Sequence, residues 1–277
     1  MIYKKFSILI IPFLLTFLLT GLLSADVDNS YVYKIPDYMK NENSIKKLRE
    51  FIYSAKTTDR IVTCLRLAEI GGEQSLQLLK EAVEKEPYYS VVDPCSGVKY
   101  YALTSIGKIG GSEAEEYLNS IISRYSIQNG DGLNHMDSIV TLHGAFEGLY
   151  EMGTNSAVFS LEDVYKNKDL YWFERDLADL ILLKCELRSE KITTAADTAQ
   201  YLIEQLKPYD EYPKHMDEHG VNDQSFRYKN ARFWLFQFRK ITLPYLEEYI
   251  LELPYNNSKA EDLKKLRDSM IANWPRE

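Results

Sequence analysis

The chain has 277 residues, with 33 lysines and arginines against 41 aspartates and glutamates, and a formal net charge of −8. Such an acidic balance argues against nucleic acid as a partner, because general nucleic-acid binding needs clustered basic residues. The sequence contains no G-x-S-x-G elbow, phosphate-binding glycine loop or dinucleotide fingerprint, so it indicates no cofactor and leaves enzymatic activity an open question.

The first residues have the three parts of a secretory signal. Lys4 and Lys5 precede an almost uncharged apolar run at residues 6–23, and Ser24-Ala25 stand before Asp26. We therefore expect a signal peptide at residues 1–25, with residues 26–277 exported to the periplasm or secreted. The alternative is an uncleaved membrane anchor formed by residues 6–23, since that run is just long enough to span a bilayer. Removal of the signal would leave 31 basic and 41 acidic residues.

An opening helix is expected at residues 44–55, followed by one pattern that occurs three times. The copies run over Asp59–Gly72, Val98–Gly111 and, more loosely, Thr141–Gly153. Equivalent glycines at positions 71, 110 and 153 are 39 and 43 residues apart, which is a period typical of stacked helical hairpins.

Each copy places small or apolar residues at helical spacing and then ends in glycine. The three stripes are Thr63, Leu67 and Ile70; Ala102, Ile106 and Ile109; and Ala145, Leu149 and Met152. A glycine after the last apolar residue predicts a helix end with positive φ. A second amphipathic stretch follows at residues 75–83, 114–125 and 157–165. A single hairpin cannot bury both of its helices, so stacked neighbours and a solenoid are predicted.

Residues 98–114 resemble the HEAT-like repeats of phycobilin lyases, through Val98-Lys99, Ala102, Ser105-Ile106-Gly107, Ile109-Gly110 and Glu113-Ala114. The resemblance covers residues 58–166, and the first and third copies depart from it at Ala68 and Tyr150, where the middle copy has Gly107. It implies an armadillo-like α-solenoid and says little about chemistry, because a fold does not define a function.

Beyond Asn167 the pattern weakens but stays helical, so residues 167–277 are expected to form degenerate repeats. Leu177 to Cys185 and Ala195 to Leu206 suit one pair of helices. Ala231 to Phe238 and Leu243 to Leu246 suit another, with Pro244 near the start of its second helix. Lys259 to Asn273 suits a closing helix. The predicted fold class is therefore all-α, an α-solenoid of about five helical hairpins, with one short strand candidate at residues 90–92.

The function that this architecture favours is an exported scaffold that binds a protein or peptide. Solenoids expose a long face on the second helix of each pair, and in the HEAT-like family that face is usually concave. The candidate partner-binding residues on these helices form a mixed, acid-rich set: Lys80, Glu81, Glu84, Glu116, Asn119 and Glu162. Such a surface favours a partner with a basic or neutral contact surface, held in a salt-sensitive way.

The alternative function is an exported enzyme, such as a metal-dependent hydrolase using His215-Met216-Asp217-Glu218-His219, which matches the string H-x-x-E-H. Prolines and a glycine crowd this segment, so a loop without metal is the favoured interpretation. A turn at residues 129–134 carries oxygen ligands but lacks the full carboxylate spacing of a calcium loop. His135 and His143 lack further ligands at metal-site spacing. No catalytic or metal-binding residue is therefore assigned.

The three cysteines leave at least one without a disulfide partner inside the chain, and their spacing selects no pair. Cys64 lies on an apolar stripe and is expected to be a buried thiol. The 21 tyrosines are unusually numerous, and those in loops are candidates for a contact surface, since tyrosine is favoured at interfaces.

Overall fold

The computed structural model describes residues 33–85, 97–126, 135–188, 192, 194–209, 223–254 and 257–273. The chain divides into two compact units, Met1–Lys34 and Ile35–Glu277, and the fold below is that of the second unit. The expected signal peptide at residues 1–25 and the strand candidate at residues 90–92 lie outside the described residues.

The described residues form helices and no strand, which confirms the all-α fold class. The thirteen helices are α2 (Asp37–Lys40), α3 (Ile45–Ile52), α4 (Thr57–Ile70), α5 (Gly72–Lys85), α6 (Val98–Ile109), α7 (Ser112–Tyr125), α8 (His135–Met152), α9 (Asn155–Lys166), α10 (Trp172–Leu187), α11 (Ala195–Glu204), α12 (Asp223–Gln237), α13 (Arg239–Glu252) and α14 (Ser258–Ala272).

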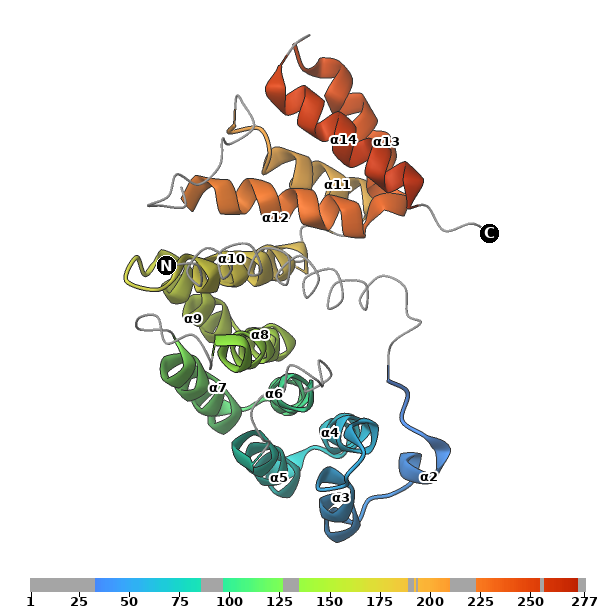
Figure 1. Cartoon of the computed structure of the whole chain (residues 1–277), viewed down its shortest axis with the longest axis vertical. Helices are drawn as coiled ribbons and strands as arrows, with labels where there is room; N and C mark the ends of the chain where they lie inside the picture. Colours follow the sequence, from blue (N-terminus) through green and yellow to red (C-terminus); the bar gives the residue numbers. More distant parts are fainter. Residues whose placement is uncertain are drawn as a thin grey trace, which may run out of the picture. The chain divides into compact units, whose positions relative to one another are not determined.

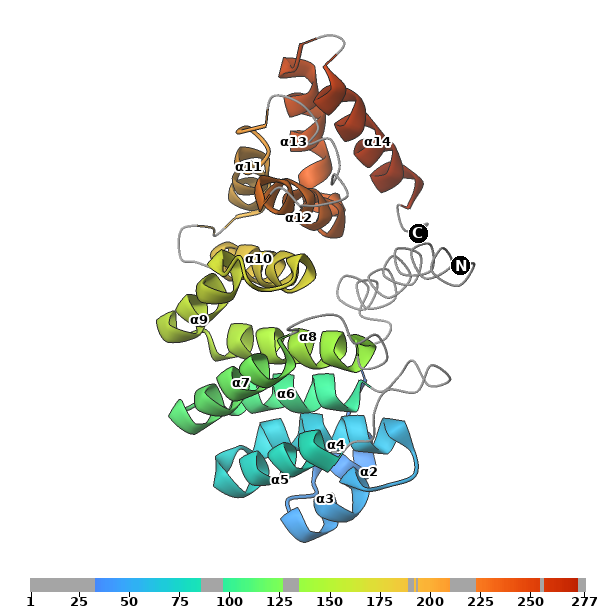
Figure 2. The ribbon, with the colours of Figure 1, turned by 60° about the vertical axis from the view of Figure 1, so that its left-hand side comes forward.

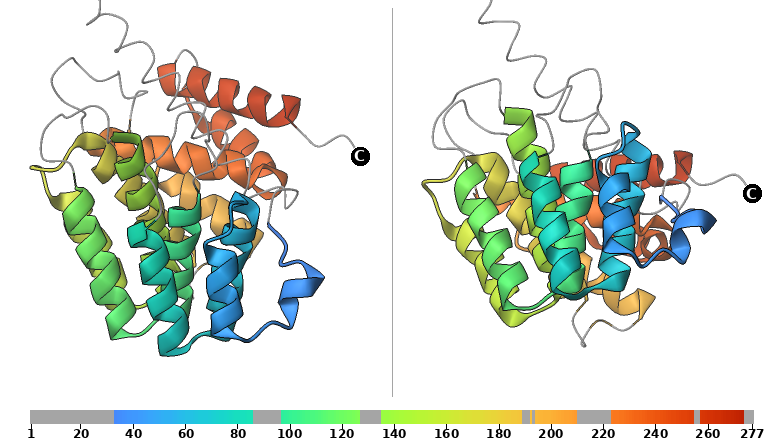
Figure 3. Two further views of the ribbon diagram at one scale, coloured as in Figure 1. Left: turned by 60° about the horizontal axis from the view of Figure 1, so that its bottom comes forward. Right: turned by 90° about the horizontal axis from the view of Figure 1, so that it is seen from below.

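Neighbouring helices pack in series as hairpins, in the manner of a solenoid. The first helices α4, α6, α8, α10 and α12 each contact the next in the row. The second helices α5, α7 and α9 lie along the other side of this row, each against the first helix of its own or the following pair (Figure 1). Seen from below, the successive helices from α3 to α9 run roughly parallel (Figure 3).

The repeated glycine makes the same turn in all three copies. The N–H groups of Gly71, Gly110 and Gly153 donate to the carbonyls of Leu67, Ile106 and Leu149 at N···O distances of 2.9, 3.1 and 3.4 Å. Gly110 has φ 72° and ψ −168°, a conformation that only glycine adopts at low cost. The positive φ is as expected, while the extended ψ sends the chain outward into the second helix.

The predicted apolar stripes are equivalent in burial as well as in spacing. Thr63 and Leu67, Ala102 and Ile106, and Ala145 and Leu149 are all buried, and the last residue of each stripe is half-buried. The three copies therefore place the same positions in a shared core.

Two local features differ from expectation. A short helix, α2, precedes the opening helix α3, and its Met39 is fully buried and accepts a weak hydrogen bond from the Thr63 hydroxyl. Pro244 lies inside α13 rather than near its start, because α13 begins at Arg239 directly after α12. The closing helix is present as α14, capped by the Asn257 side chain.

Helices α6 and α8, which run alongside each other in Figure 2, have an extensive and very close contact. A Cβ built on Gly107 would lie 2.0 Å from the carbonyl oxygen of Gly148. A Cβ on Gly144 would lie 2.8 Å from Cα of Tyr100, and one on Gly148 would lie 2.7 Å from the oxygen of Leu103. The two backbones are therefore in direct contact through three glycines.

We expect Gly107→Ala to destabilise the fold by about 2 kcal/mol or more, because the obstacle is backbone that no rotamer change can move. Gly110→Val is the comparison: a Cβ at that position would lie 3.9 Å from the Gly107 carbonyl oxygen, an ordinary contact, so its cost comes mainly from the positive φ, about 1 kcal/mol. Urea denaturation of both variants checks the order. A Gly107→Ala variant as stable as the natural chain would contradict the close crossing.

Candidate partner-binding surface

The six candidate residues all lie on second helices, as the sequence predicted. Lys80, Glu81 and Glu84 belong to α5, Glu116 and Asn119 to α7, and Glu162 to α9. They do not form one continuous set of available side chains, because those on α5 are already used within the fold.

Glu81 and Glu84 bind neighbouring helices. Arg49 of α3 donates two hydrogen bonds to the Glu81 carboxylate, at 2.6 and 3.1 Å, and the Arg49 guanidinium holds the pKa of Glu81 below its usual value. Arg124 of α7 contacts both oxygens of Glu84, at 2.9 and 2.8 Å, and Tyr117 donates to the same carboxylate at 2.9 Å. Burial, together with this carboxylate, raises the pKa of Tyr117.

Lys80 is also engaged, since its ammonium lies 2.8 Å from Glu113 of α7 and over the Tyr117 ring. Together these pairs tie α3 to α5 and α5 to α7 along the outside of the stack. Exposed ion pairs add little net stability. Their consequence here is that a partner would have to displace an internal ligand to use Lys80, Glu81 or Glu84.

The second helices α5, α7 and α9 form the outer, more widely spaced row. Among the described residues, consecutive first helices contact one another extensively, whereas α5 and α7, or α7 and α9, do not. Helices on the inner side of a curved stack lie closer together than those on the outer side. The concave side expected for the second helices by resemblance is therefore the side of the first helices.

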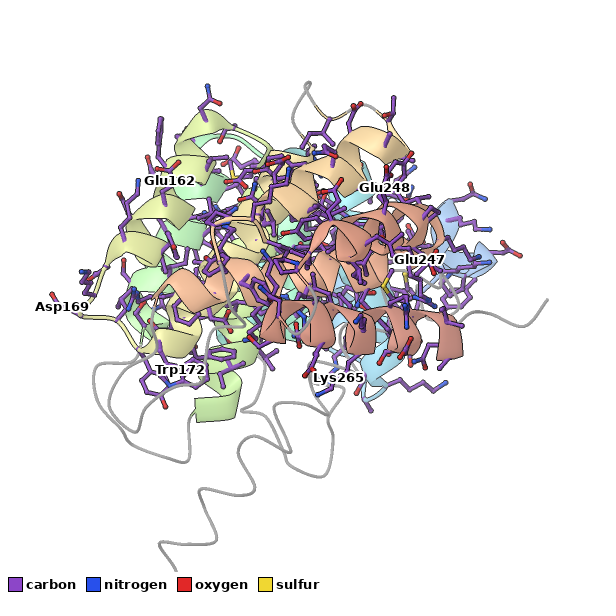
Figure 4. The ribbon with its side chains drawn as sticks, turned by 90° about the horizontal axis from the view of Figure 1, so that it is seen from above. Glu162, Asp169, Trp172, Glu247, Glu248 and Lys265 are labelled. Atoms are coloured by element: carbon purple, nitrogen blue, oxygen red, sulfur yellow. The ribbon has the colours of Figure 1, made fainter. Side chains whose placement is uncertain are left out.

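The candidate carboxylates that pair with no other helix, among the described residues, lie on α7 and α9. Glu116 is exposed and, like the exposed Asp163, makes no ion pair within the described part of the chain. Among the described residues, Glu162 pairs with Lys166 alone, one turn along its own helix, at 2.5 Å. Asn119 is half-buried, and its carbonyl oxygen accepts a hydrogen bond from Ser123. In Figure 4 the labelled Glu162 and Asp169 lie at one outer edge of the ribbon, well apart from Glu247 and Glu248 of α13.

Sequence reasoning missed Phe159 of α9, whose side chain is 62% exposed. It precedes Glu162 and Asp163 by three and four residues, so the ring and the two carboxylates share one helix face. The spacing in the sequence could have shown that Phe159 is exposed, because Phe159 does not fall on the buried stripe of Ala157, Leu161 and Val164. The expectation for tyrosines fits Tyr171 in part, since it lies 43% exposed directly before α10.

A second polar cluster lies on the first helices and is buried. Glu147 of α8 accepts a hydrogen bond from Lys184 of α10 at 2.8 Å, and the His143 ring lies 3.8 Å away. Burial by itself would raise the pKa of Glu147, but the His143 ring and the Lys184 ammonium outweigh it and lower the pKa to about 2. Lys184 and Arg188 both stack on the Tyr150 ring. This cluster joins α8 to α10.

We expect Glu147→Gln to destabilise the fold at pH 7 by about 3 kcal/mol, because it leaves the Lys184 ammonium without its carboxylate in a largely buried setting. A lowered folded-state pKa gives stability that is present above the unfolded value of 4.5 and is lost as pH falls toward 2. The difference in melting temperature between natural chain and variant should thus narrow from pH 5 to pH 3. A difference that stays constant would show that the ion pair does not carry the effect.

The structure gives no side-chain geometry for most of the candidate metal-binding residues. The segment His215–His219, the turn at residues 129–134 and the His135 side chain lie outside the described residues. In the described ranges, no three histidine, cysteine, aspartate or glutamate side chains come together in a way that could hold a metal ion. His143 is half-buried on α8, where its ring packs against Tyr100. None of the helices described is long and apolar enough to cross a membrane.

The two described cysteines differ in setting. Cys64 is fully buried in α4, as predicted. Cys185 is a free thiol near the end of α10, and burial raises its pKa to about 11. A thiol with such a pKa is a weak nucleophile at neutral pH, so Cys185 suits packing rather than catalysis.

No protein-family model matches this chain, and no curated protein matches it in sequence. The class of protein is thus defined by the fold alone: an all-α stack of helical hairpins.

Proposed function

We propose that this protein is an exported helical-repeat scaffold that binds a protein or peptide on the outer face of α7 and α9. The observation that carries the proposal is the exposed Phe159 ring together with three carboxylates, Glu116, Glu162 and Asp163, that pair with no other helix among the described residues. The HEAT-like resemblance of residues 58–166 and the serial packing of the helices support a scaffold.

The chemistry of this surface favours a basic partner segment. A large exposed ring offers apolar area to be buried at the centre of an interface, and surrounding carboxylates exclude water and select for positive charge. The face on α5 is less suited, because its carboxylates already hold Arg49 and Arg124. Binding should accordingly weaken as salt is added.

We expect Glu116→Lys with Glu162→Lys to reduce capture of the partner at least tenfold, because both substitutions reverse charge on the binding face without breaking a contact between helices. The matched control is Glu247→Lys with Glu248→Lys, an equal charge change at exposed positions on α13. The partner is first obtained by pull-down from the envelope fraction of native cells, and affinities are then compared by surface plasmon resonance.

Phe159→Ser should weaken binding by a similar factor while leaving the circular dichroism spectrum and melting temperature unchanged. If the α7–α9 variants bind as tightly as the natural chain while the α13 control does not, the partner contacts the other end of the stack. Full affinity in all variants would move the site to the first helices or to the tyrosine-bearing loops.

Export is tested separately. Mass spectrometry of the protein from the envelope fraction should find Asp26 or a near neighbour as the first residue, because Ser24-Ala25 offers the small residues that signal cleavage requires. An intact Met1 in that fraction would favour the anchor at residues 6–23. Recovery in the cytoplasm alone would refute export.

A further inference from the structure

The helices fall into two groups that meet at one contact. Helices α11 to α14 pack against each other, and helices α2 to α10 pack in series before them. Among the described helices, the only extensive contact between the groups is the one between α10 and α12. The chemistry of this junction therefore decides how firmly the C-terminal group is held.

The junction is built from buried charged and polar side chains, in contrast to the glycine-lined crossing of α6 and α8. Asp179 of α10 is completely buried; Asn230 of α12 donates to one of its oxygens at 2.9 Å, and Nε of Arg227 lies 2.9 Å from the other. Asn230 also donates to the main chain and the side chain of Asp176, at 3.2 Å each. Lys229 pairs with the same Asp176 carboxylate.

Helix α11 joins this network through Glu186. The guanidinium of Arg227 lies 2.5 Å from the Glu186 carboxylate, and the Tyr201 hydroxyl donates to the same carboxylate. Arg227 thus bridges two carboxylates of α10, and it keeps one of them if the other loses its charge. The Trp234 indole N–H adds a hydrogen bond to the Leu180 carbonyl, at 3.2 Å.

Carboxylates outnumber cations at this junction. The groups that face Asp179 are Asp176 and Glu186 on α10, Arg227 and Asn230 on α12, Tyr201 on α11 and Tyr209 just after it. Lys229 pairs with Asp176, so the ion pairs of the junction join three carboxylates, on Asp176, Asp179 and Glu186, to two cations, Arg227 and Lys229. Burial raises the pKa of Asp179 to about 6, with Asp176 and Glu186 adding to the rise and Arg227 and Asn230 opposing it.

We propose that the α10–α12 junction is a proton-sensitive latch, in which protonation of Asp179 tightens the hold of α10 on helices α11 to α14 and its ionisation loosens that hold. Protonation of Asp179 removes one negative charge from a site where carboxylates outnumber cations. Arg227 then still pairs with the Glu186 carboxylate. The ionised form instead keeps a fully desolvated carboxylate among other carboxylates, a state that opening to water relieves.

The direction of the pH dependence follows from the difference in the pKa of Asp179 between the closed and the opened junction. In the closed junction the pKa of Asp179 is raised above its ordinary value. In an opened junction, where water reaches the carboxyl group, the pKa returns to that ordinary value. The stabilisation of the closed junction by the proton on Asp179 is therefore complete below about pH 4 and is lost as pH rises through about 6. From pH 5 to pH 7.5 the equilibrium constant for opening should increase about tenfold.

Hydrogen exchange of the full chain tests this, since opening of the junction exposes amides of α12. After correction for intrinsic exchange rates, protection in α12 should fall about tenfold from pH 5 to pH 7.5, while protection in α4 and α6 should change little. Asp179→Asn should abolish this pH dependence. Asp262→Asn is the matched control: burial also raises the pKa of Asp262, but its partners Arg232 and Tyr228 lie on α12, within the C-terminal group, so the pH dependence should remain.

A second variant keeps the test decisive if Asp179→Asn does not fold. Asn230→Ala removes the donor that favours the ionised form, so the midpoint of the change in α12 protection should move to higher pH. Protection in α12 that is independent of pH in the natural chain, or an unchanged midpoint in Asn230→Ala, would overturn the latch. Equal loss of protection in α4, α6 and α12 would also overturn it, because the event would then be global unfolding.

Discussion

The crossing of α6 and α8 is the contact on which the rest of the stack depends. Carbonyl oxygen of one helix meets Cα of the other because Gly107 and Gly148 carry no side chain at the point of contact. This approach brings the first helices close, and the burial of Leu103, Ile106, Leu142 and Phe146 around it follows. Close packing of this kind has no room for an added methyl group, so glycine is required there for steric reasons rather than for its backbone freedom.

The close approach of the first helices has a consequence for the second helices. Since the inner row is drawn together, the outer row is spread apart, and long side chains span the separation between α3, α5 and α7. Arg49, Lys80 and Arg124 do this by pairing with carboxylates on the neighbouring helix. Where the row continues to α9, the described carboxylates lack partners from another helix, and an exposed phenylalanine accompanies them. The difference between a structural and an available surface thus arises within one row.

The same molecule joins helices by two kinds of contact. At the crossing of α6 and α8 the helices meet through glycine and aliphatic side chains, which do not titrate. From α10 to α12 they meet through carboxylates, a guanidinium and an amide, which respond to protons and tolerate fewer changes. Among the described helices, the C-terminal group is held extensively only through this polar junction, which is therefore a natural place for the stack to open.

The sequence by itself determined the helical class, the period of the repeat, the glycine turns and the buried stripes, because these depend on residue spacing and on backbone conformation. It also located the second helices and the candidate residues on them. The existence of α2 and the position of Pro244 within α13 were beyond it, since both depend on packing against distant segments. Tertiary structure alone decided which charged side chains form ion pairs between helices. Nothing in the local pattern separates Glu81, held by Arg49 from 32 residues away, from Glu116, which makes no ion pair with the described residues. It likewise decided that Asp179 meets Arg227 and Asn230, because long-range ion pairs are set by how helices stack and not by what lies next to them in the chain.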